Sequence, residues 1–478
     1  MIETMPTLPA TETILPLFEA QKRHAIQLRR EKIAARKERL TRLRQWIMAN
    51  RPKIQQALYA DFRKPSLEVD ATEIFPVITE ISLAKSSLQK WTRPKPVDTP
   101  LTMIGSRAHI QYEPKGVCLI IAPWNYPFNL CIGPLVSALA AGNAVILKPS
   151  ELTPNTSAVL RQLCVDLFDP KEVTLIEGGP EVSQYLLSLP FDHIFFTGSP
   201  AIGKVVMRAA AEHLTSVTLE LGGKSPVIVT PTANLNDAAT RIAVAKFINK
   251  GQTCIAPDYV LVHESIASAL IEKLKEKTMG MFSEAGKPMQ ESPHYARIVN
   301  EKHFRRVKGI IEDALANGAR LHMQPDYDEA SCFIHPVILT GVNMESRVME
   351  EEIFGPVLPV LTYSNLEDAI ELINHKPKPL ALYVFSSDSA ESRHVLQATT
   401  SGTACINDCA IQFLHHNLPF GGVNNSGIGK AHGYFGFLAF SNEKPVLKQR
   451  SGFTSVKSLY PPYKKSSQVM MDWLLRLS

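Results

Sequence analysis

The chain has 478 residues, of which 45% are hydrophobic and 20% are charged, so it is a globular protein with room for about three domains. This composition excludes a disordered chain, a coiled coil and a collagen-like repeat. The net charge of +5 is uneven, because residues 21–53 hold twelve Lys or Arg and two Asp or Glu. We interpret this segment as the solvated face of a helix and expect no nucleic-acid partner.

The cysteines and the apolar runs indicate the cellular compartment of the protein. Seven cysteines are spread over the chain without a CxxC pair, which favours reduced thiols in the cytoplasm and predicts no metal site. No run of 18 apolar residues is present, so we expect no transmembrane span. The first 13 residues lack a basic segment followed by an apolar one, so we also expect no secretory signal.

The segment 12–90 has the pattern of helices. Apolar residues recur every seven positions and predict one amphipathic face along the basic helix. They are Ile26, Ile33, Leu40 and Ile47. Residues 91–100 are rich in proline and polar side chains and predict a linker, and alternation over 108–112 predicts a half-exposed strand.

From residue 116 onward, short apolar runs alternate with helical stretches. Such runs are typical of strands buried on both faces, and the alternation predicts parallel sheets in α/β domains. The first group covers 117–122, 144–147, 173–176, 193–197 and 217–219. The second group covers 226–229, 259–262, 357–361 and 381–385.

Three residues are candidates for chemistry. Cys254 follows the helical stretch 237–249 and a glycine turn, and it is either a nucleophile or an inert buried thiol. Glu220 ends an apolar run before a glycine pair, where burial would suit a general base; it could instead pair with Lys224. Asn125 ends the first buried strand and either donates to an oxyanion or caps a turn.

Three further segments are candidates for cofactor binding. The turn Gly198-Ser199 leaves a strand and enters a helix containing Gly203, a geometry that suits an anion, although the GxxxxG spacing matches no standard fingerprint. The segment KPSE at 148–151 ends the next strand and either holds ribose hydroxyls or forms a surface ion pair. The acidic turn at 350–356 is a third candidate, and its alternative is a solvated loop.

The motifs occur together and in a fixed order. They are PWNYP, KPSE, FTGS followed by G, LELGGK, GQTC, EEIFGPV and LPFGGV. This set resembles the aldehyde dehydrogenase superfamily from about residue 20 to about residue 462. The segments KFINKGQTCIAPDYVL and LPFGGVNNSGIGKAHG are similar to the class 3 branch of fatty and aromatic aldehyde dehydrogenases, which are commonly homodimers that use NAD or NADP.

The resemblance implies an α/β fold of three parts. A Rossmann-type cofactor-binding domain would comprise 1–91 and 115–221, and an α/β catalytic domain 222–419. A small β bridging, or oligomerisation, domain would comprise 92–114 and 420–465, with the strand at 108–112 in its sheet. A C-terminal helix would cover 466–478.

The resemblance also implies the roles of single residues. Cys254 would be the nucleophile, Glu220 the general base that hydrolyses a thioester, and Asn125 the oxyanion donor. Cofactor contacts are implied for Trp124, Lys148, Glu151, Gly198, Ser199, Gly203, Leu221, Gly222, Glu352 and Phe354. The substrate tunnel would include Tyr126, Thr253 and Phe420. The activity implied is oxidation of medium-chain or long-chain aliphatic or aromatic aldehydes to acids, with NAD as cofactor and NADP as the alternative.

Other interpretations remain to be weighed against this one. A dehydrogenase that acylates coenzyme A generally lacks the base at Glu220, a binding protein on this scaffold would be expected to lose the catalytic residues, and no histidine is placed by motif to make Cys254 a hydrolase nucleophile. The C-terminal helix has an apolar face made of Val469, Met470, Trp473, Leu474 and Leu477. It could cover the tunnel mouth, pack on a neighbouring subunit or, least favoured, touch a membrane.

Overall fold

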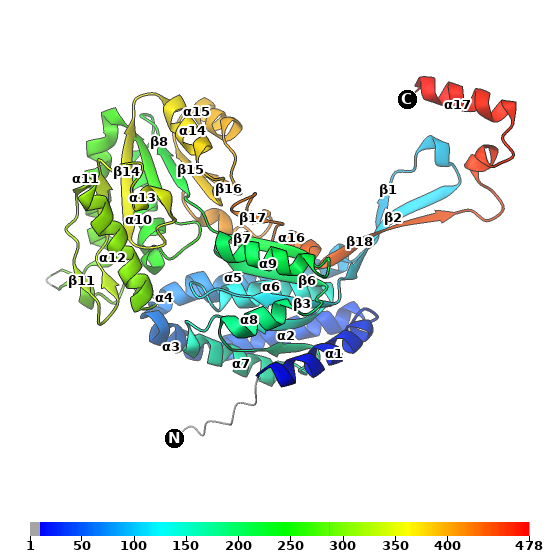
Figure 1. Ribbon diagram of the computed structural model, residues 1–478, viewed down its shortest axis with the longest axis horizontal. Coiled ribbons are helices and arrows are strands. Elements are labelled where there is room, and N and C mark those ends of the chain that lie inside the picture. The colour runs from blue at the N-terminus through cyan, green and yellow to red at the C-terminus, as the bar shows by residue number, and fades with distance from the viewer. Residues whose placement is uncertain (1–9, 286, 478) are drawn as a thin grey trace.

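The computed structural model of the protein describes residues 10–285 and 287–477. Two α/β bodies lie side by side, and an arm of three strands projects from one of them (Figure 1). The expectation of no secretory signal depends on residues 1–9 above all, which lie outside the described residues.

The first body is built on a six-stranded sheet in the order β17-β7-β6-β3-β4-β5. Its strands are β3 (Val117–Ile121), β4 (Ala144–Lys148), β5 (Val173–Leu175), β6 (His193–Gly198), β7 (Ser216–Leu221) and β17 (Gly427–Ile428). All are parallel except β17, and the chain order reverses between β3 and β6. Ligands of such sheets bind outside the carboxyl ends of the strands at this reversal, where Asn125 and Ser199 lie.

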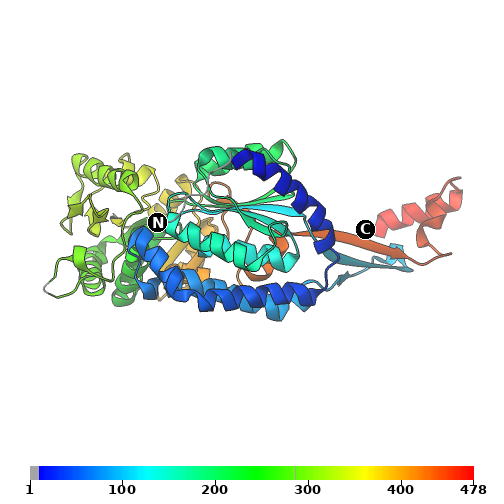
Figure 2. The same cartoon turned by 90° about the horizontal axis from the view of Figure 1, so that it is seen from below.

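Both faces of this sheet are covered by helices because its strands are apolar on both sides (Figure 2). Cys118 and Ile120 face one core, and Val117 and Leu119 face the other. The first core contains α2 (Ile33–Ala49), α3 (Arg51–Phe62), α5 (Phe75–Trp91), α6 (Asn129–Ala141), α7 (Pro154–Leu167) and α16 (Gly433–Ala439). The second contains α1 (Ala10–Leu28), α8 (Pro180–Leu187) and α9 (Pro200–Ala211).

The single basic helix predicted over 21–53 is wrong. The chain leaves α1 at Leu28, turns, and re-enters a helix at Ile33, and Ile26 is 59% exposed. Because α1 and α2 cover opposite faces of the sheet, the seven-residue spacing joins two helices that do not share a face.

The second body is built on a seven-stranded sheet in the order β10-β13-β14-β9-β8-β15-β16, parallel except for β10. Its strands are β8 (Pro226–Val229), β9 (Tyr259–His263), β10 (Arg320–Leu321), β13 (Val337–Thr340), β14 (Val357–Tyr363), β15 (Ala381–Phe385) and β16 (Thr403–Ile406). Its main helices are α10 (Leu235–Phe247), α11 (Ala267–Phe282), α12 (Glu301–Ala316), α14 (Leu366–His375) and α15 (Ser389–Ala398). These elements match the predicted second α/β pattern.

The arm is an antiparallel sheet of β1 (Lys95–Val97), β2 (Ser106–Pro114) and β18 (Ser441–Gln449). The predicted linker at 91–100 therefore contains a strand, and the strand predicted at 108–112 is longer at both ends. The predicted bridging segment 420–465 also starts too early, because β17 and α16 pack with the first body. The arm ends in α17 (Lys465–Leu477), and no helix in the described chain is long and apolar enough to cross a membrane.

Candidate active site

Cys254 and Glu220 lie where two cavities meet. One, called the α6 cavity here, is walled by α5, α6 and the loops around Phe420 and has an empty volume of about 870 Å³. The other, called the α9 cavity, runs past the first turn of α9 to the segment around Glu352. Cys254 and Glu220 line both cavities, together with Leu130, Thr197 and Leu221.

The loop before Cys254 has a strained backbone. Asn249, Lys250 and Gly251 are all left-handed, with φ of 49°, 59° and 71°. A Cβ at position 251 would lie 2.4 Å from the carbonyl oxygen of Gly355, so only glycine fits there. Strain of this kind persists where the surroundings over-determine the loop, and it clusters at functional sites.

Hydrogen bonds from distant segments hold this loop. The Gln252 amide donates to the carbonyls of Asn249 and Arg297, each at 3.0 Å, and its Oε1 accepts from Val299 N at 3.0 Å. The partly buried Glu68 carboxylate accepts from Asn249 N at 3.0 Å. These contacts fix the backbone that carries Cys254.

Asn125 is buried beside the same loop. Its side-chain Nδ2 donates to the Gln252 carbonyl at 3.0 Å. Its backbone carbonyl accepts from Asn249 Nδ2 at 2.9 Å and from Lys64 Nζ at 3.3 Å. Lys64 is fully buried and paired at 2.7 Å with Glu73, which is also fully buried. Because an amide nitrogen carries two hydrogens, Asn125 Nδ2 can hold Gln252 and still donate to a second oxygen.

Glu220 is buried near the end of β7. Neither of its carboxylate oxygens has a hydrogen-bond partner among the described residues. Burial raises its pKa well above the ordinary value, and the charge of Lys430 opposes this only in part. The alternative pairing with Lys224 is wrong, because Lys224 forms its ion pair with Asp258.

Burial also controls the protonation of the Cys254 thiol. Desolvation raises the pKa of Cys254 to about 12, and the carboxylates of Glu352 and Glu220 act in the same direction. The thiol is therefore protonated at neutral pH in the ligand-free protein, and attack needs a base or a change in surroundings. All seven cysteines are free, as expected for reduced thiols.

The α9 cavity has the features of an anion and ribose site. Ser199 caps α9, its hydroxyl accepting from Ile202 N, and the helix start lines the cavity. A Cβ at Gly203 would come within 2.8 Å of Leu221, so this glycine allows the helix to pack closely on β7. A Cβ at Gly222 would come within 2.2 Å of the Glu352 carboxylate. These close approaches fit a dinucleotide, as does the buried Glu352 Oε1, which has no hydrogen-bond partner in the described part of the chain.

At Glu352 the acidic turn is not a solvated loop. Burial raises the pKa of Glu352 to about 8. Phe354 is left-handed with φ of 44°, and its ring meets Trp124 edge to face at 5.3 Å. Arg306 holds this turn by donating to the Ile353 carbonyl at 2.7 Å. Arg306 and His303 also line the cavity from α12, and neither could be predicted because no local motif marks them.

Lys148 and Glu151 lie apart from the α9 cavity, at the carboxyl end of β4. Glu151 lines a separate hollow, and its carboxylate is 3.6 Å from Lys148 Nζ. Lys148 is buried and also donates to the Pro149 carbonyl at 2.8 Å. The ion pair given as the alternative is present, and the ribose contact stays a prediction.

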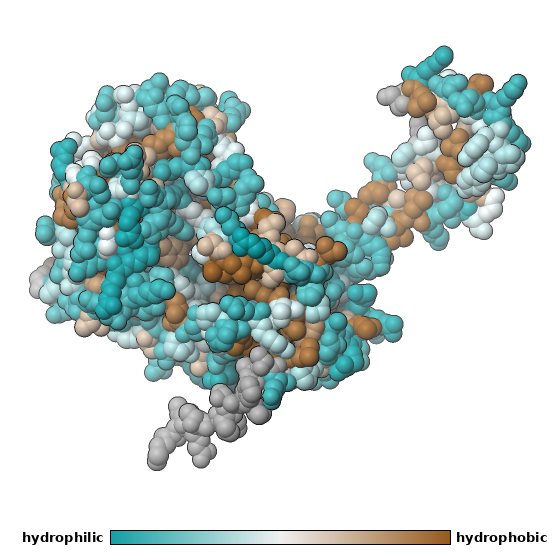
Figure 3. All heavy atoms as spheres, in the orientation of Figure 1, coloured by the Kyte–Doolittle hydropathy of each residue, from teal (hydrophilic) through white to brown (hydrophobic). Residues whose placement is uncertain are grey.

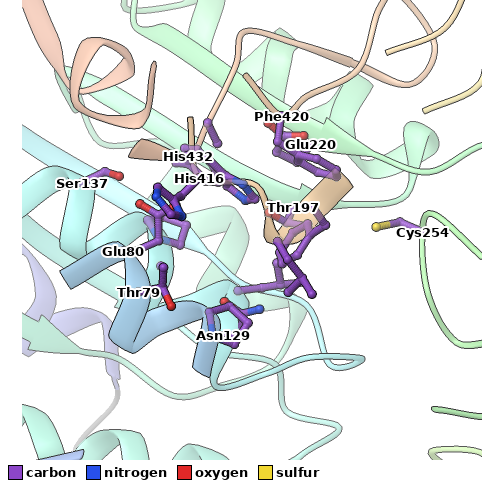
Figure 4. Close-up of a pocket in the computed structure, with 18 of the residues that line it drawn as sticks. Thr79, Glu80, Asn129, Ser137, Thr197, Glu220, Cys254, His416, Phe420 and His432 are labelled. Atoms are coloured by element: carbon purple, nitrogen blue, oxygen red, sulfur yellow. The ribbon is translucent and has the colours of Figure 1, made fainter. Parts of the chain in front are cut away.

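The α6 cavity differs in part from the predicted tunnel. Phe420 lines it, whereas neither Tyr126 nor Thr253 is among the described residues of its wall. Their hydroxyls instead bond each other at 2.7 Å. Polar side chains that the sequence analysis did not assign to the tunnel, including His416, line the cavity, and Figure 4 shows them. Within the described chain, no group of three or more His, Cys, Asp or Glu has the geometry to hold a metal ion.

The comparisons with known proteins agree with this geometry. The sequence pattern of the aldehyde dehydrogenase family matches residues 4–446. The chain belongs to the aldehyde dehydrogenase family. This aldehyde dehydrogenase is 46% identical over 432 residues to 4,4'-diaponeurosporen-aldehyde dehydrogenase of Staphylococcus aureus, covering 90% of this chain and 93% of that protein. It is 42% identical over 439 residues to aldehyde dehydrogenase family 3 member A2 of Macaca fascicularis, covering 92% and 88%.

Solved structures share the fold of this aldehyde dehydrogenase. The substrate-bound AldH of Staphylococcus aureus has a TM-score of 0.92 and 42% identity, covering 96% of this chain and 99% of that one. An indole-3-acetaldehyde dehydrogenase in complex with NAD+ has a TM-score of 0.83 and 28% identity, covering 92% and 89%. The glyceraldehyde-3-phosphate dehydrogenase GapN of Methanocaldococcus jannaschii, complexed with NADP, has 0.85 and 25%, covering 94% and 97%. The predicted fold and the resemblance to class 3 are confirmed.

Proposed function

We propose that this aldehyde dehydrogenase oxidises aldehydes to carboxylic acids with NAD or NADP, with Cys254 as nucleophile and Glu220 as general base. The observation that supports this most directly is that both residues line the junction of the two cavities. An aldehyde in the α6 cavity and a cofactor in the α9 cavity would meet there.

The residues of the chain suit each step. The Cys254 thiol releases its proton to water and the resulting thiolate attacks the aldehyde carbon. The oxyanion of the thiohemiacetal accepts hydrogen bonds from Asn125 Nδ2 and the Cys254 backbone N–H. A cofactor bound near Glu352 and Phe354 would supply the hydride acceptor. Glu220 then takes a proton from the water that hydrolyses the thioester, and the acid leaves.

The test is formation of NADH or NADPH from an aldehyde by the wild type and by the Cys254→Ala variant. We expect Cys254→Ala to abolish turnover. Cys332→Ala is the matched control, because Cys332 is also free and partly buried but lies outside both cavity walls. Full activity of Cys254→Ala would refute the proposal.

The substrates we propose are medium-chain or long-chain aliphatic and aromatic aldehydes. The α6 cavity supports this because much of its wall is apolar. The apolar wall includes Phe75, Pro76, Leu130, Pro134, Leu414 and Phe420. We expect kcat/KM to rise with chain length from propanal to decanal, and a flat profile would contradict this assignment.

For the cofactor we propose NAD first and NADP second. The Glu151 carboxylate lies partly exposed at the end of β4, where it would repel a 2′-phosphate. We expect Glu151→Gln to raise kcat/KM for NADP relative to that for NAD. An NADP preference above tenfold in the wild type would contradict the assignment.

We also propose a cytoplasmic homodimer formed through the arm. Figure 3 shows apolar side chains along the arm and on α17, away from both bodies, and those exposed include Val97, Leu447, Tyr463, Val469 and Trp473. Because α17 lies at the end of the arm and away from α6 (Figure 1), packing on a neighbouring subunit is favoured over covering the chain's own tunnel mouth. Deleting residues 451–478 should weaken the dimer in light scattering. Unchanged chain-length selectivity in that variant would exclude a gating role.

A further inference from the structure

The α6 cavity has a polar end. Side chains with hydrogen-bonding groups line it on the side away from Cys254, and Figure 4 shows four of them together. They are Glu80 of α5, Ser137 of α6, and His416 and His432 of the returning chain. The mechanism proposed above uses none of them.

Ser137 contributes an unsatisfied hydroxyl. The residue is only 7% exposed, and its hydroxyl makes no hydrogen bond to any described residue. Gly436 of α16 leaves the space for it, because a Cβ there would lie 2.4 Å from Ser137 Oγ. An apolar ligand group that covers this hydroxyl would leave it without a partner, whereas a ligand hydroxyl would bond it.

His432 contributes a second such group. Its ring stacks on Phe420 at 5.0 Å and meets Phe413 edge to face at 4.6 Å, which fixes its plane. Its Nδ1 is buried and has no hydrogen-bond partner among the described residues. Burial and the nearby His416 lower the pKa of His432 to about 4, so at neutral pH the ring is uncharged and offers one donor and one acceptor.

The charge at this end selects among ligands. Both oxygens of the Glu80 carboxyl group accept from Gly433 N, at 3.2 and 2.9 Å, and burial raises its pKa to about 7. Among the described residues that wall the cavity, none is Lys or Arg. A carboxylate on the ligand would therefore meet Glu80 without a cation, whereas a hydroxyl could donate to one neighbour and accept from another.

We propose that the polar end of the α6 cavity binds a hydroxyl group at the far end of the substrate, so that the favoured substrates are aldehydes with a distal hydroxyl. This inference rests on the proposed aldehyde oxidation, since the aldehyde must reach Cys254 at the opposite end. A purely apolar chain end would cover the Ser137 hydroxyl without bonding it, which would cost roughly tenfold to a hundredfold in kcat/KM.

The test compares unsubstituted, ω-hydroxy and ω-carboxy aldehydes of matched lengths from six to sixteen carbons. We expect the ω-hydroxy compound to exceed its unsubstituted counterpart at least tenfold in kcat/KM at one or two lengths, and the ω-carboxy compound to be the poorest. Ser137→Ala should reduce this preference from both sides: kcat/KM for the ω-hydroxy aldehyde should fall, and kcat/KM for the unsubstituted aldehyde should rise because no hydroxyl is then left unsatisfied.

Thr79→Val is the matched control, because the Thr79 hydroxyl lines the same cavity but already donates to the Phe75 carbonyl at 2.9 Å. It should leave the preference unchanged. Cys254-dependent oxidation with equal kcat/KM for hydroxy and unsubstituted aldehydes at every length would overturn this inference alone. Absence of turnover with every aldehyde would overturn the proposed function as well.

Discussion

Breaking the buried pair of Lys64 and Glu73 by removing one partner should strongly destabilise the first body. Both side chains have no exposed surface, and Lys64 also lies 4.3 Å from the centre of the Tyr126 ring. Lys64→Met keeps the length of the side chain and removes its charge, which leaves Glu73 buried without a cation. Breaking a buried pair in this way costs about 3–5 kcal/mol.

The assay is urea unfolding followed by tryptophan fluorescence, because Trp46 and Trp91 lie in the core of the first body. Lys64→Met should lower the free energy of unfolding by about 3–5 kcal/mol. The double variant Lys64→Met/Glu73→Gln should recover most of this loss. It removes both charges and keeps an acceptor for Asn129 N, which Glu73 now bonds at 2.9 Å.

The control breaks an exposed pair of the same region. Arg51 is half exposed and pairs with Asp70, so Arg51→Met should cost less than about 1 kcal/mol. A loss below 1 kcal/mol in Lys64→Met, or a double variant no more stable than the single one, would refute the reasoning.

The remaining predictions concern the chemistry at Cys254. Asn125→Ala should lower kcat by about 10²–10³-fold through loss of an oxyanion donor, and steady-state rates within tenfold of wild type would contradict this. Glu220→Gln should give a burst of about one NADH per subunit followed by slow turnover, because the thioester forms but is not hydrolysed; rapid mixing without a burst would argue against that role. Since burial raises the pKa of Cys254 to about 12, the thiolate fraction increases with pH, and alkylation by iodoacetamide should accelerate about tenfold per unit from pH 7 to 10. A plateau below pH 9 would disagree.

Local sequence patterns predicted the parts of the fold that depend on local forces. The apolar runs at 117–122 and 226–229 are strands because they are buried on both faces, and burial of that kind is visible in a few residues. The prediction of a single N-terminal helix was wrong because it depended on packing between distant segments. Ile26 and Ile33 keep a helical spacing, yet they belong to helices on different faces of the sheet, and the turn between them has no proline or glycine to mark it.

The residues of the candidate site were likewise predictable only where a local motif marks them. Cys254, Glu220 and Asn125 carry recognisable neighbours in sequence, and the structure gathers all three around the junction of the cavities. His416 and His303 line the cavities although nothing near them in sequence indicates it. They arrive through the packing of α12 and of the chain that returns after β16, which a local pattern does not contain.

The pairing of β17 with β7 has a consequence for the order in which the protein can be completed. Gly427 lies opposite Glu220, and Leu221 N donates to the Ser426 carbonyl at 3.0 Å, so the strand carrying the base gains its outer neighbour from chain made about two hundred residues later. During synthesis the first body must wait, with an open strand edge at β7, until nearly all of the second body has been made. A nascent chain that stalls in this interval exposes that edge to other chains, and this is where we expect the need for chaperones to be greatest.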